Sequence, residues 1–304
     1  MTSAVETFGL TKRYGSVTAV SDLSLRIEPG QVFGFLGPNG AGKSTTIRML
    51  MALQRPAKGR VSVLGLDAHA GTVAVRRRIG YLPGDLELFP RLTGRQHIAW
   101  FARSRGLHDY SLAGHLAGRF QVVADRPVRE LSKGNRQKIG LVLAFMHRPE
   151  LLVLDEPTSG LDPLMQREFE DLLQETAAEG RTVFLSSHEL DEVQRSAHRI
   201  GIIRDGRLVA EDTVEGLRRA APRKMEIRFR RPVDQAELDV LRGVTVIAAD
   251  GPRVTLDVTG EIGPVLRVIA SHDPVDLTSR PPDLDELFLG FYRQPPAKKV
   301  PDAG

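Results

Sequence analysis

An α/β fold with a mainly parallel sheet, followed by a small α+β domain, is predicted by three observations. Short continuous apolar runs alternate with stretches of helical spacing in the first part of the chain. The run at 31–36 passes through a glycine-rich turn directly into a helical stretch. After residue 222, apolar residues alternate with polar ones, a period that is typical of a half-solvated antiparallel sheet.

Composition and charge narrow the class of protein. A chain of 304 residues suits one large domain or two ordinary ones, and 41% hydrophobic with 26% charged residues is an ordinary globular composition. The absence of cysteine excludes a disulfide framework, a thiolate metal site and a cysteine nucleophile. The net charge of +4 is too mild to argue for nucleic acid. No run approaches the roughly 18 apolar residues of a membrane span, and residues 1–13 lack the apolar core of a signal peptide, so we expect a cytosolic chain.

The expected elements of the first domain follow in chain order. A strand at 31–36 leads into a helix at 44–53. Two further apolar runs, 151–154 and 182–185, flank a stretch of helical spacing at 164–178. Runs of this length suit strands that are buried on both faces of a parallel sheet, and parallel strands need crossover helices between them.

The pattern changes near a proline-marked junction, where we expect a domain boundary. In 225–229 apolar residues occupy every second position, which indicates a strand with one buried face. We therefore expect a first domain over 1–221 and a small α+β domain over 222–293, with the approximate order β-α-β-β-α-β. The tail at 294–304 is rich in Pro, Lys and Ala and is predicted to be disordered.

The glycine-rich turn carries a phosphate-binding pattern. The residues GPNGAGKST at 37–45 fit G-x-x-x-x-G-K-[ST] where a strand passes into a helix. Glycines allow close backbone approach, so that N–H groups and the helix N-terminus face an anion. In this pattern Lys43 bridges the outer phosphates and Ser44 coordinates Mg²⁺, against the alternative of a turn that merely packs. The predicted phosphate-binding residues are Gly37, Pro38, Asn39, Gly40, Ala41, Gly42, Lys43, Ser44 and Thr45.

A second element supplies two acids. The apolar run at 151–154 ends in Asp155 and Glu156, at the sheet edge where ligands of open α/β sheets bind. We expect Asp155 to hold Mg²⁺ and Glu156 to act as the general base that deprotonates an attacking water. Taken alone, two acids after a strand would suit a helix cap equally well, and the phosphate-binding pattern favours the catalytic role.

Three further segments complete an ordered set of motifs. They are LSKGNRQ at 131–137, SGLD at 159–162 and His188 in LSSHE. Together with the phosphate-binding pattern, this set resembles the ATP-binding cassette (ABC) ATPases, the nucleotide-binding subunits of ABC transporters, over about residues 5–215. The resemblance implies a P-loop NTPase cassette with a helical subdomain at about 85–148, which binds ATP and Mg²⁺ and hydrolyses ATP.

The resemblance also implies roles for single residues. Ser132 and Gly134 would cap the γ-phosphate held by another subunit in a head-to-tail dimer, and Asp162 would lie at the dimer seam. His188 would contact the γ-phosphate, although a lone histidine is more often a structural residue. Tyr14 would stack on adenine, and the alternative is a half-buried residue at the end of a strand.

Two departures from the family pattern stand out. Gly84 occupies the position of a glutamine that usually touches the metal and the attacking water. Either Asp85 or Glu87 substitutes for it, or the contact is mediated by water, or the loop serves only to dock a partner. Lys133 and Asn135 replace the usual Gly and Gln of the LSGGQ motif, and Lys133 either adds charge toward the phosphate or points to solvent.

A narrower resemblance comes from GYLPGDLELFPRLTG at 80–94, TSGLDPLMQ at 158–166 and DLDELFLGFY at 283–292. These segments are similar to those of ABC-2-type exporter ATPases, including drug-resistance ATPases. The resemblance implies a separate polytopic membrane permease and a second ATPase subunit, with a homodimer expected and a paralogue as the alternative. It places the chain in the cytoplasm, on the inner face of the cell membrane through the permease.

Other classes remain as alternatives. A non-transport ABC ATPase acting on nucleic acid or the ribosome would be expected to carry paired cassettes, coiled-coil insertions or zinc-binding cysteines, and the sequence has none of these. A small-molecule kinase has no use for LSKGNRQ, SGLD and the histidine together. A binding subunit without hydrolysis is disfavoured because Lys43, Ser44, Asp155, Glu156 and His188 are all present.

Overall fold

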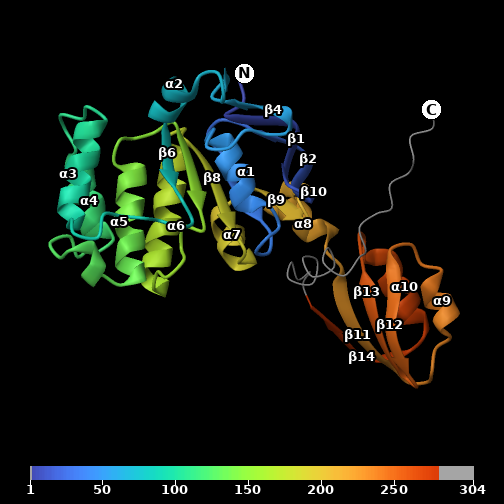
Figure 1. The fold of residues 1–304 in the computed structure, drawn as a ribbon. Helices are drawn as coiled ribbons and strands as arrows, with labels where there is room; N and C mark the ends of the chain where they lie inside the picture. Colours follow the sequence, from blue (N-terminus) through green and yellow to red (C-terminus); the bar gives the residue numbers. More distant parts are fainter. Residues whose placement is uncertain (1, 281–304) are drawn as a thin grey trace, which may run out of the picture. The chain divides into compact units, whose positions relative to one another are not determined.

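The computed structural model describes residues 2–280 and divides the chain into two compact units, Met1–Glu211 and Asp212–Gly304 (Figure 1). The division falls within β10, ahead of α8, whereas the sequence analysis placed the boundary after Ala221. The expected tail at 294–304 and the motif at 283–292 lie outside the described residues. Across the described range, no helix combines the length and the apolar character needed to cross a membrane.

A six-stranded sheet forms the centre of the first unit, in the strand order β10-β9-β3-β8-β7-β6. The pairs β3–β8, β3–β9, β7–β8 and β6–β7 are parallel. Every residue of β3, β7 and β8 is buried, which confirms the prediction of strands covered on both faces. The strands are β3 (Val32–Leu36), β6 (Ile79–Leu82), β7 (Leu151–Asp155), β8 (Thr182–Ser187), β9 (Arg199–Arg204) and β10 (Arg207–Thr213).

Helices cover both faces of this sheet. A Cβ on Gly34 of β3 would meet Val193 of α7, so this face is packed closely against that helix. Phe33 and Phe35 point the other way and join a core with Ile47 of α1. The helices are α1 (Lys43–Leu50), α2 (Thr72–Arg77), α6 (Pro163–Ala178) and α7 (Leu190–Ser196).

A second sheet in this unit was not expected from the sequence. Its order is β2-β1-β4-β5 and its strands are antiparallel. Val5, Leu10 and Val63 bury side chains in the same core as α1, so this sheet packs over the first helix. The strands are β1 (Val5–Tyr14), β2 (Val17–Ile27), β4 (Lys58–Val63) and β5 (Leu66–Asp67).

A helical segment is inserted between β6 and β7. Thr93 begins its first helix with a reciprocal capping box to Gln96, and Ser132 caps its last helix by accepting a bond from the Asn135 N–H. Ile139 is fully buried in a small core of its own in this segment. The elements are α3 (Gly94–Ser104), α4 (Ser111–Arg119), the 3-10 turn η1 (Val128–Glu130) and α5 (Lys133–Phe145).

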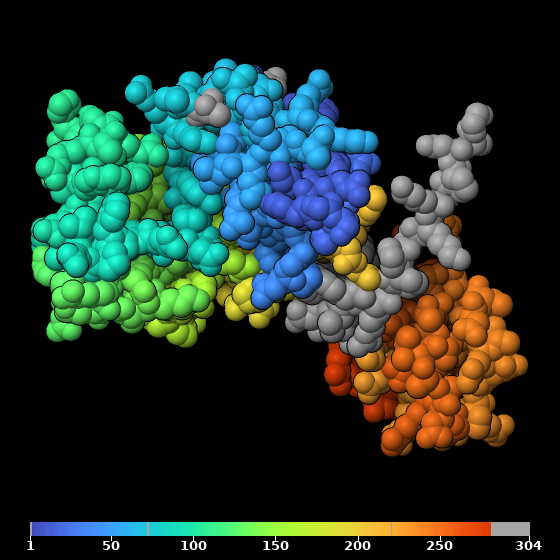
Figure 2. Space-filling model, viewed as in Figure 1, coloured from blue at the N-terminus to red at the C-terminus, as the bar shows by residue number. Residues whose placement is uncertain are grey.

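The second unit, drawn in orange to red in Figure 2, begins with α8 and contains a four-stranded antiparallel sheet in the order β12-β13-β11-β14. Met225, Ile227 and Phe229 are buried against α9 and α10, which confirms the alternation read from the sequence. This arrangement is the split β-α-β architecture. The elements are α8 (Val214–Ala220), β11 (Arg223–Phe229), α9 (Gln235–Asp239), β12 (Val244–Asp250), β13 (Arg253–Val258), α10 (Gly263–Ser271) and β14 (Pro274–Ser279).

Candidate functional site

The glycine loop between β3 and α1 has a backbone that only glycine fits. Gly40 and Gly42 have φ of 82° and 109°, in the left-handed region that disfavours other residues. A Cβ on Gly42 would lie 2.6 Å from the carbonyl oxygen of Ala19, and one on Gly37 would lie 2.5 Å from that of Ile203. The loop is therefore held tightly against β2 and β9, and it leads directly into the N-terminus of α1, where N–H groups attract anions.

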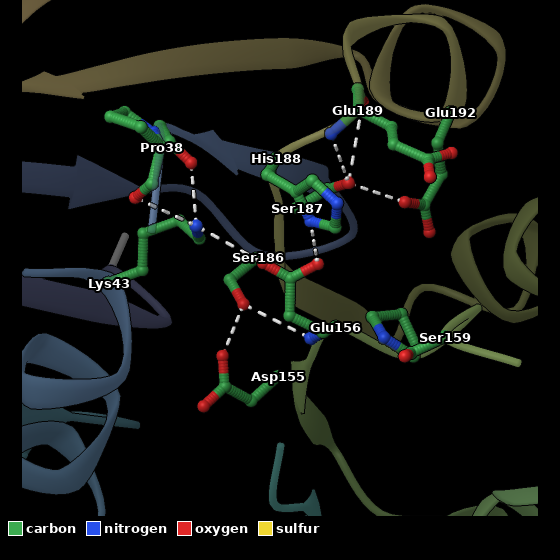
Figure 3. A network of polar contacts seen from close by, with 12 residues as sticks. Pro38, Lys43, Asp155, Glu156, Ser159, Ser186, Ser187, His188, Glu189 and Glu192 are labelled. Atoms are coloured by element: carbon green, nitrogen blue, oxygen red, sulfur yellow. Dashed lines mark hydrogen bonds and ion pairs between the residues drawn. The ribbon is translucent and has the colours of Figure 1, made fainter. Parts of the chain in front are cut away.

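Lys43 extends from the start of α1 into this loop (Figure 3). Its side chain is only 5% exposed, and its Nζ donates to the carbonyl oxygens of Gly37 at 2.6 Å and Pro38 at 3.3 Å. The same Nζ lies 3.1 Å from Oε1 of Glu156. A buried ammonium group is costly unless it is paired and hydrogen-bonded, and here one cation links the glycine loop to the end of β7.

Asp155 and Glu156 differ sharply in conformation. Asp155 ends β7, is buried, and accepts a bond of 2.5 Å from Oγ of Ser186. Glu156 has a φ of 50°, a left-handed conformation that costs about 1–3 kcal/mol for a residue other than glycine. Its N–H donates to the carbonyl oxygen and Oγ of Ser186, each at 3.2 Å. This turn takes Glu156 out of the strand direction, and its carboxylate contacts Lys43 and His188.

His188 completes the group at the end of β8. Its Nδ1 lies 2.6 Å from Oε2 of Glu156, so Nδ1 carries the proton in this hydrogen bond. About half of the His188 side chain is exposed, whereas the Glu156 side chain is 22% exposed. The carboxylate of Glu156 therefore lies between a cation and an imidazole, and two different strands fix it.

The helix that follows the LSKGNRQ segment packs closely against the SGLD segment. A Cβ on Gly134 would lie 2.3 Å from the carbonyl oxygen of Gly160, so only glycine allows this approach. Asn135 exchanges two bonds with the backbone of Val123, at 2.8 Å and 3.1 Å, which joins α5 to the segment after α4. Ser132 serves as the N-cap of α5. In the described part of the chain, no hydrogen bond or ion pair joins Ser132 to Lys43, Glu156 or His188.

Comparisons with known proteins assign the family. Residues 20–159 match the family described as ABC transporter. The chain is 35% identical over 233 residues to the bacitracin transport ATP-binding protein BcrA of Bacillus licheniformis, which covers 75% of this chain and 76% of that protein. It is 35% identical over 300 residues to the daunorubicin resistance ATP-binding protein DrrA3 of Streptomyces coeruleorubidus, at 94% and 95% coverage. This chain belongs to the ABC transporter family. It is an ATP-binding, ATP-hydrolysing subunit.

Solved structures agree with this family assignment. An ATP-binding subunit of an ABC transporter matches with a TM-score of 0.65 and 31% identity, over 71% of this chain and 92% of that one. A dimeric ATP-binding cassette with bound ADP and Pi shares the fold, with a TM-score of 0.62, 22% identity, and coverage of 69% and 98%. The fold predicted from the sequence, a P-loop NTPase cassette, is confirmed.

Other expected site residues of this ABC subunit lie apart from the Lys43–Glu156–His188 group. Tyr14 stands at the end of β1, is 44% exposed, and donates its hydroxyl proton to Gln54. Asp162 caps α6: its carboxylate accepts a hydrogen bond from the Met165 N–H, and this bond lowers the pKa of the Asp162 carboxyl. A Cβ on Gly84 would lie 3.1 Å from Oδ2 of Asp155, so the loop after β6 passes beside the expected metal ligand.

The two acids that follow Gly84, Asp85 and Glu87, are both exposed. Lys133 is exposed, and its Nζ donates to Oγ of Ser159 at 2.8 Å, in the SGLD segment of its own chain.

Two residues near the site were not identified from the sequence. Gln137, the last residue of LSKGNRQ, donates from Nε2 to the carbonyl oxygens of Pro157 at 2.9 Å and Glu156 at 3.2 Å. These two hydrogen bonds stabilise the left-handed turn at Glu156. Glu192 lies in α7, and nothing in the sequence around it indicates that it is buried beside the site.

Glu192 is a buried carboxyl group behind the site. It is 3% exposed and accepts a bond of 2.5 Å from Oγ of Ser187. Burial raises its pKa to about 7, and the negative charges of Glu156 and Glu189 act in the same direction. The hydroxyls of Ser187 and Thr158 act against this rise. Near neutral pH the group is therefore poised between a neutral and a charged form beside the reacting residues.

Proposed function

We propose that this chain hydrolyses ATP to drive export of a solute through a separate polytopic membrane permease. Supporting this, one relative is named for bacitracin transport and another for daunorubicin resistance. A third, 37% identical over 205 residues, is a Nod factor export ATP-binding protein of Burkholderia pseudomallei. These names favour transport over the alternative of an ABC ATPase that acts on nucleic acid or the ribosome.

The observation that carries the catalytic assignment is the contact of one carboxylate with two partners, Lys43 at 3.1 Å and His188 at 2.6 Å. Glu156 accepts the proton of a water that attacks the γ-phosphorus, and His188 holds the carboxylate in position and contacts the γ-phosphate. Lys43 binds the outer phosphate oxygens together with the N–H groups of the loop at 37–45. Phosphate and ADP are the products.

The donors present also fit Mg²⁺, which prefers a few oxygen ligands together with phosphates. Asp155 offers a carboxylate that Ser186 orients at 2.5 Å, and Ser44 offers a hydroxyl in the first turn of α1. When bound, Mg²⁺ would neutralise charge on the phosphate oxygens. We therefore assign Ser44 and Asp155 as its ligands.

A second ATPase subunit completes the site in this proposal, and a second copy of this chain is the simplest partner. Ser132 and Gly134 lie at the N-terminus of the 13-residue helix α5, an end that attracts phosphate. They would cap the γ-phosphate on the partner, with Asp162 at the seam and Tyr14 against adenine. The assembly would lie on the cytoplasmic face of the membrane through the permease.

Replacing Glu156 by Gln tests the catalytic assignment. The amide keeps the shape of the side chain and cannot accept the proton, so phosphate release at saturating ATP and Mg²⁺ should fall by about 10²–10⁴. ATP affinity, measured by calorimetry, should be retained, and ATP should trap a dimer. The matched control is Glu189→Gln, which replaces an exposed acid of the same region and should keep wild-type turnover. Wild-type turnover in Glu156→Gln would show that the general-base assignment is wrong.

The transport assignment needs a separate experiment. The chain should co-purify with a polytopic membrane protein when the two are expressed together, and vesicles that contain both should move a solute only with hydrolysable ATP. Glu156→Gln should abolish this movement without releasing the chain from the membrane protein. A chain that hydrolyses ATP yet associates only with nucleic acid or ribosomes would contradict the transport assignment alone.

A further inference from the structure

A cluster of positively charged side chains lies at the amino end of the edge strand β6, at the opposite end of the sheet from the glycine loop. We call it the arginine hollow: a surface hollow of about 700 Å³ lined by Arg76, Arg77, Arg103, Arg105 and His147. No carboxyl group lines it among the described residues. Arg105 and His147 both contact the carbonyl oxygen of Ile79, the first residue of β6, so the hollow lies at the amino end of this strand.

Three of the four guanidinium groups donate to backbone carbonyl oxygens, Arg103 within its own helix and two others across to neighbouring elements. Arg105 donates to the carbonyl oxygens of Arg77 and Ile79, each at 3.1 Å. Arg76 donates to two carbonyl oxygens just after α1, at 3.0 Å and 2.9 Å. A donor that is already fixed loses little conformational entropy when a ligand binds, so these arginines are preorganised.

The hollow also lacks compensating negative charge. Nearby, Arg78 pairs with Glu150 at 2.6 Å and Arg181 pairs with Glu179 at 2.6 Å. By contrast, no ion pair within residues 2–280 joins Arg76, Arg77, Arg103 or Arg105 to a carboxylate. The chain thus neutralises the arginines that surround the hollow and leaves those that line it without a counter-charge.

Burial, together with the excess of positive charge at one of them, lowers the pKa values of two titratable groups in the hollow. Burial lowers the pKa of Arg105, because no carboxylate offsets the loss of solvation. Burial, followed by the positive charges of Arg105 and Arg181, lowers the pKa of His147 to about 4. His147 is therefore neutral at physiological pH, and its ring reports the electrostatic potential of the hollow.

We propose that the arginine hollow binds a compact phosphate-bearing anion with two or more negative charges, of the phosphomonoester or diphosphate class. Guanidinium groups bind phosphate oxygens through charge-assisted hydrogen bonds, and four of them line this hollow with no carboxyl group among its lining residues. A volume of about 700 Å³ falls in the usual range for small-ligand sites, about 300–1,000 Å³. The site is separate from the nucleotide site, which lies at the carboxyl end of β7 and β8, and it goes beyond hydrolysis and export.

Calorimetry with pyrophosphate tests this proposal on the full chain saturated with ADP, so that the glycine loop is already filled. The hollow variant is Arg77→Gln with Arg103→Gln, because neither side chain donates to another element of the fold. The control is Arg242→Gln with Arg267→Gln, two exposed arginines of the second unit, which removes the same charge. Pyrophosphate should bind wild type and control equally, and the hollow variant at least about tenfold more weakly. Equal affinity in all three proteins would overturn the proposal.

The His147 ring supplies a second, site-specific measurement. A bound anion favours the protonated imidazole, so pyrophosphate should raise the pKa of His147 above its value of about 4, as followed by NMR of the ring protons. The same addition should leave the ring unchanged in the hollow variant. Binding of pyrophosphate without any change at His147 would place the anion elsewhere and reject the hollow.

Vesicles distinguish a free phosphate from a lipid headgroup. Phosphatidylcholine vesicles that contain phosphatidic acid present the same phosphomonoester on a membrane. Co-sedimentation of wild type and control, but not of the hollow variant, would support the site and identify a headgroup as its source. Pyrophosphate binding without co-sedimentation would support the site with a free phosphate as its ligand. Equal co-sedimentation of all three proteins, with no binding of pyrophosphate, would contradict the proposal.

Discussion

The two ends of the parallel sheet differ in whether their charged side chains are paired. At the carboxyl end, Lys43, Glu156 and His188 form a continuous group in which positive and negative partners lie within 3.1 Å of one another. At the amino end, Arg76 and Arg105 are anchored on backbone carbonyls and meet no carboxylate among the described residues. Chemistry on a phosphate needs both an acceptor and a cation in contact, whereas binding an anion needs only fixed donors of one sign.

The backbone at the proposed general base departs from the strand conformation. Glu156 at the carboxyl end holds a left-handed conformation at φ 50°. This local cost is offset by the bonds that its N–H donates to Ser186 and by the bond that its carbonyl oxygen accepts from Gln137. Arg105 at the amino end has ordinary helical backbone at the end of α3. Arg148, next to His147, also has a left-handed conformation at φ 49°, so such strain is not confined to the carboxyl end; at Glu156 it turns the proposed general base out of the strand direction.

The largest stability effect is expected at Glu192, which tests whether the carboxyl end tolerates additional negative charge. Its pKa rises from 4.5 to about 7 on folding, so its favourable contribution is complete below pH 4.5 and is lost as pH rises through 7. Glu192→Gln should therefore exceed wild type in free energy of unfolding by up to about 3 kcal/mol at pH 8, and by little at pH 4.5. Urea unfolding followed by fluorescence of Trp100, the chain's one tryptophan, measures this in the first unit.

Asp171→Asn is the control for this stability effect, since it removes the same charge from an exposed position of α6. It should show no comparable dependence on pH. A gain in Glu192→Gln that is the same at pH 4.5 and pH 8 would contradict the electrostatic origin and indicate better packing instead.

The next effect concerns Lys43, the cation on which the charge balance of the carboxyl end depends. Lys43→Ala removes the positive group at the outer phosphates and leaves Glu156 without its cation. ATP affinity should fall about 10–100-fold, the range for losing hydrogen bonds to a charged group. Isothermal calorimetry measures it, with Lys58→Ala, an exposed lysine of β4, as control. Unchanged affinity in Lys43→Ala would remove the phosphate-binding role of the loop.

The features that the sequence predicted are those with short-range causes. The glycines at 37, 40 and 42 are required by local backbone geometry, so their spacing identified the loop. The apolar runs of β3, β7 and β8 are buried on both faces, and continuous hydrophobicity identified them. In the second unit, alternation identified β11 because one of its faces meets helices and the other does not.

The features that it missed have long-range causes. The register of β1 is interrupted by irregularities against both β2 and β4, so its residues show no clean alternation. Glu192 looks like any acid on a short helix, and only packing in three dimensions buries it. The bond from Lys133 to Ser159 joins residues 26 positions apart and depends on how α5 approaches Gly160.

A smaller effect is expected in the loop after β6, which tests whether exposed acids assist the carboxyl end. Asp85 and Glu87 are exposed, so Asp85→Ala and Glu87→Ala should leave ATPase rates of the isolated chain within about twofold. Gly84→Gln should also be tolerated, with a small shift of the Asp155 side chain 3.1 Å away. Rates measured with the permease present should fall for the acid variants, because surface loops of this kind carry recognition. A large loss in the isolated chain would assign these acids to the reaction.

The smallest effect is expected where the amino end does pair its charges. Arg78 and Glu150 precede β6 and β7 and form a bidentate pair at 2.6 Å, with side chains 38% and 56% exposed. Water screens such a pair, so Glu150→Gln should lower the free energy of unfolding by less than about 1 kcal/mol, and 0.5 M salt should reduce that loss further. Breaking this pair also leaves Arg78 as one more unpaired guanidinium near the arginine hollow. If the amino end acts as an anion site, Glu150→Gln should therefore bind pyrophosphate somewhat more tightly, although its free energy of unfolding is slightly lower. A fall in both the pyrophosphate affinity and the free energy of unfolding would show instead that Glu150 is needed to maintain the structure of the hollow.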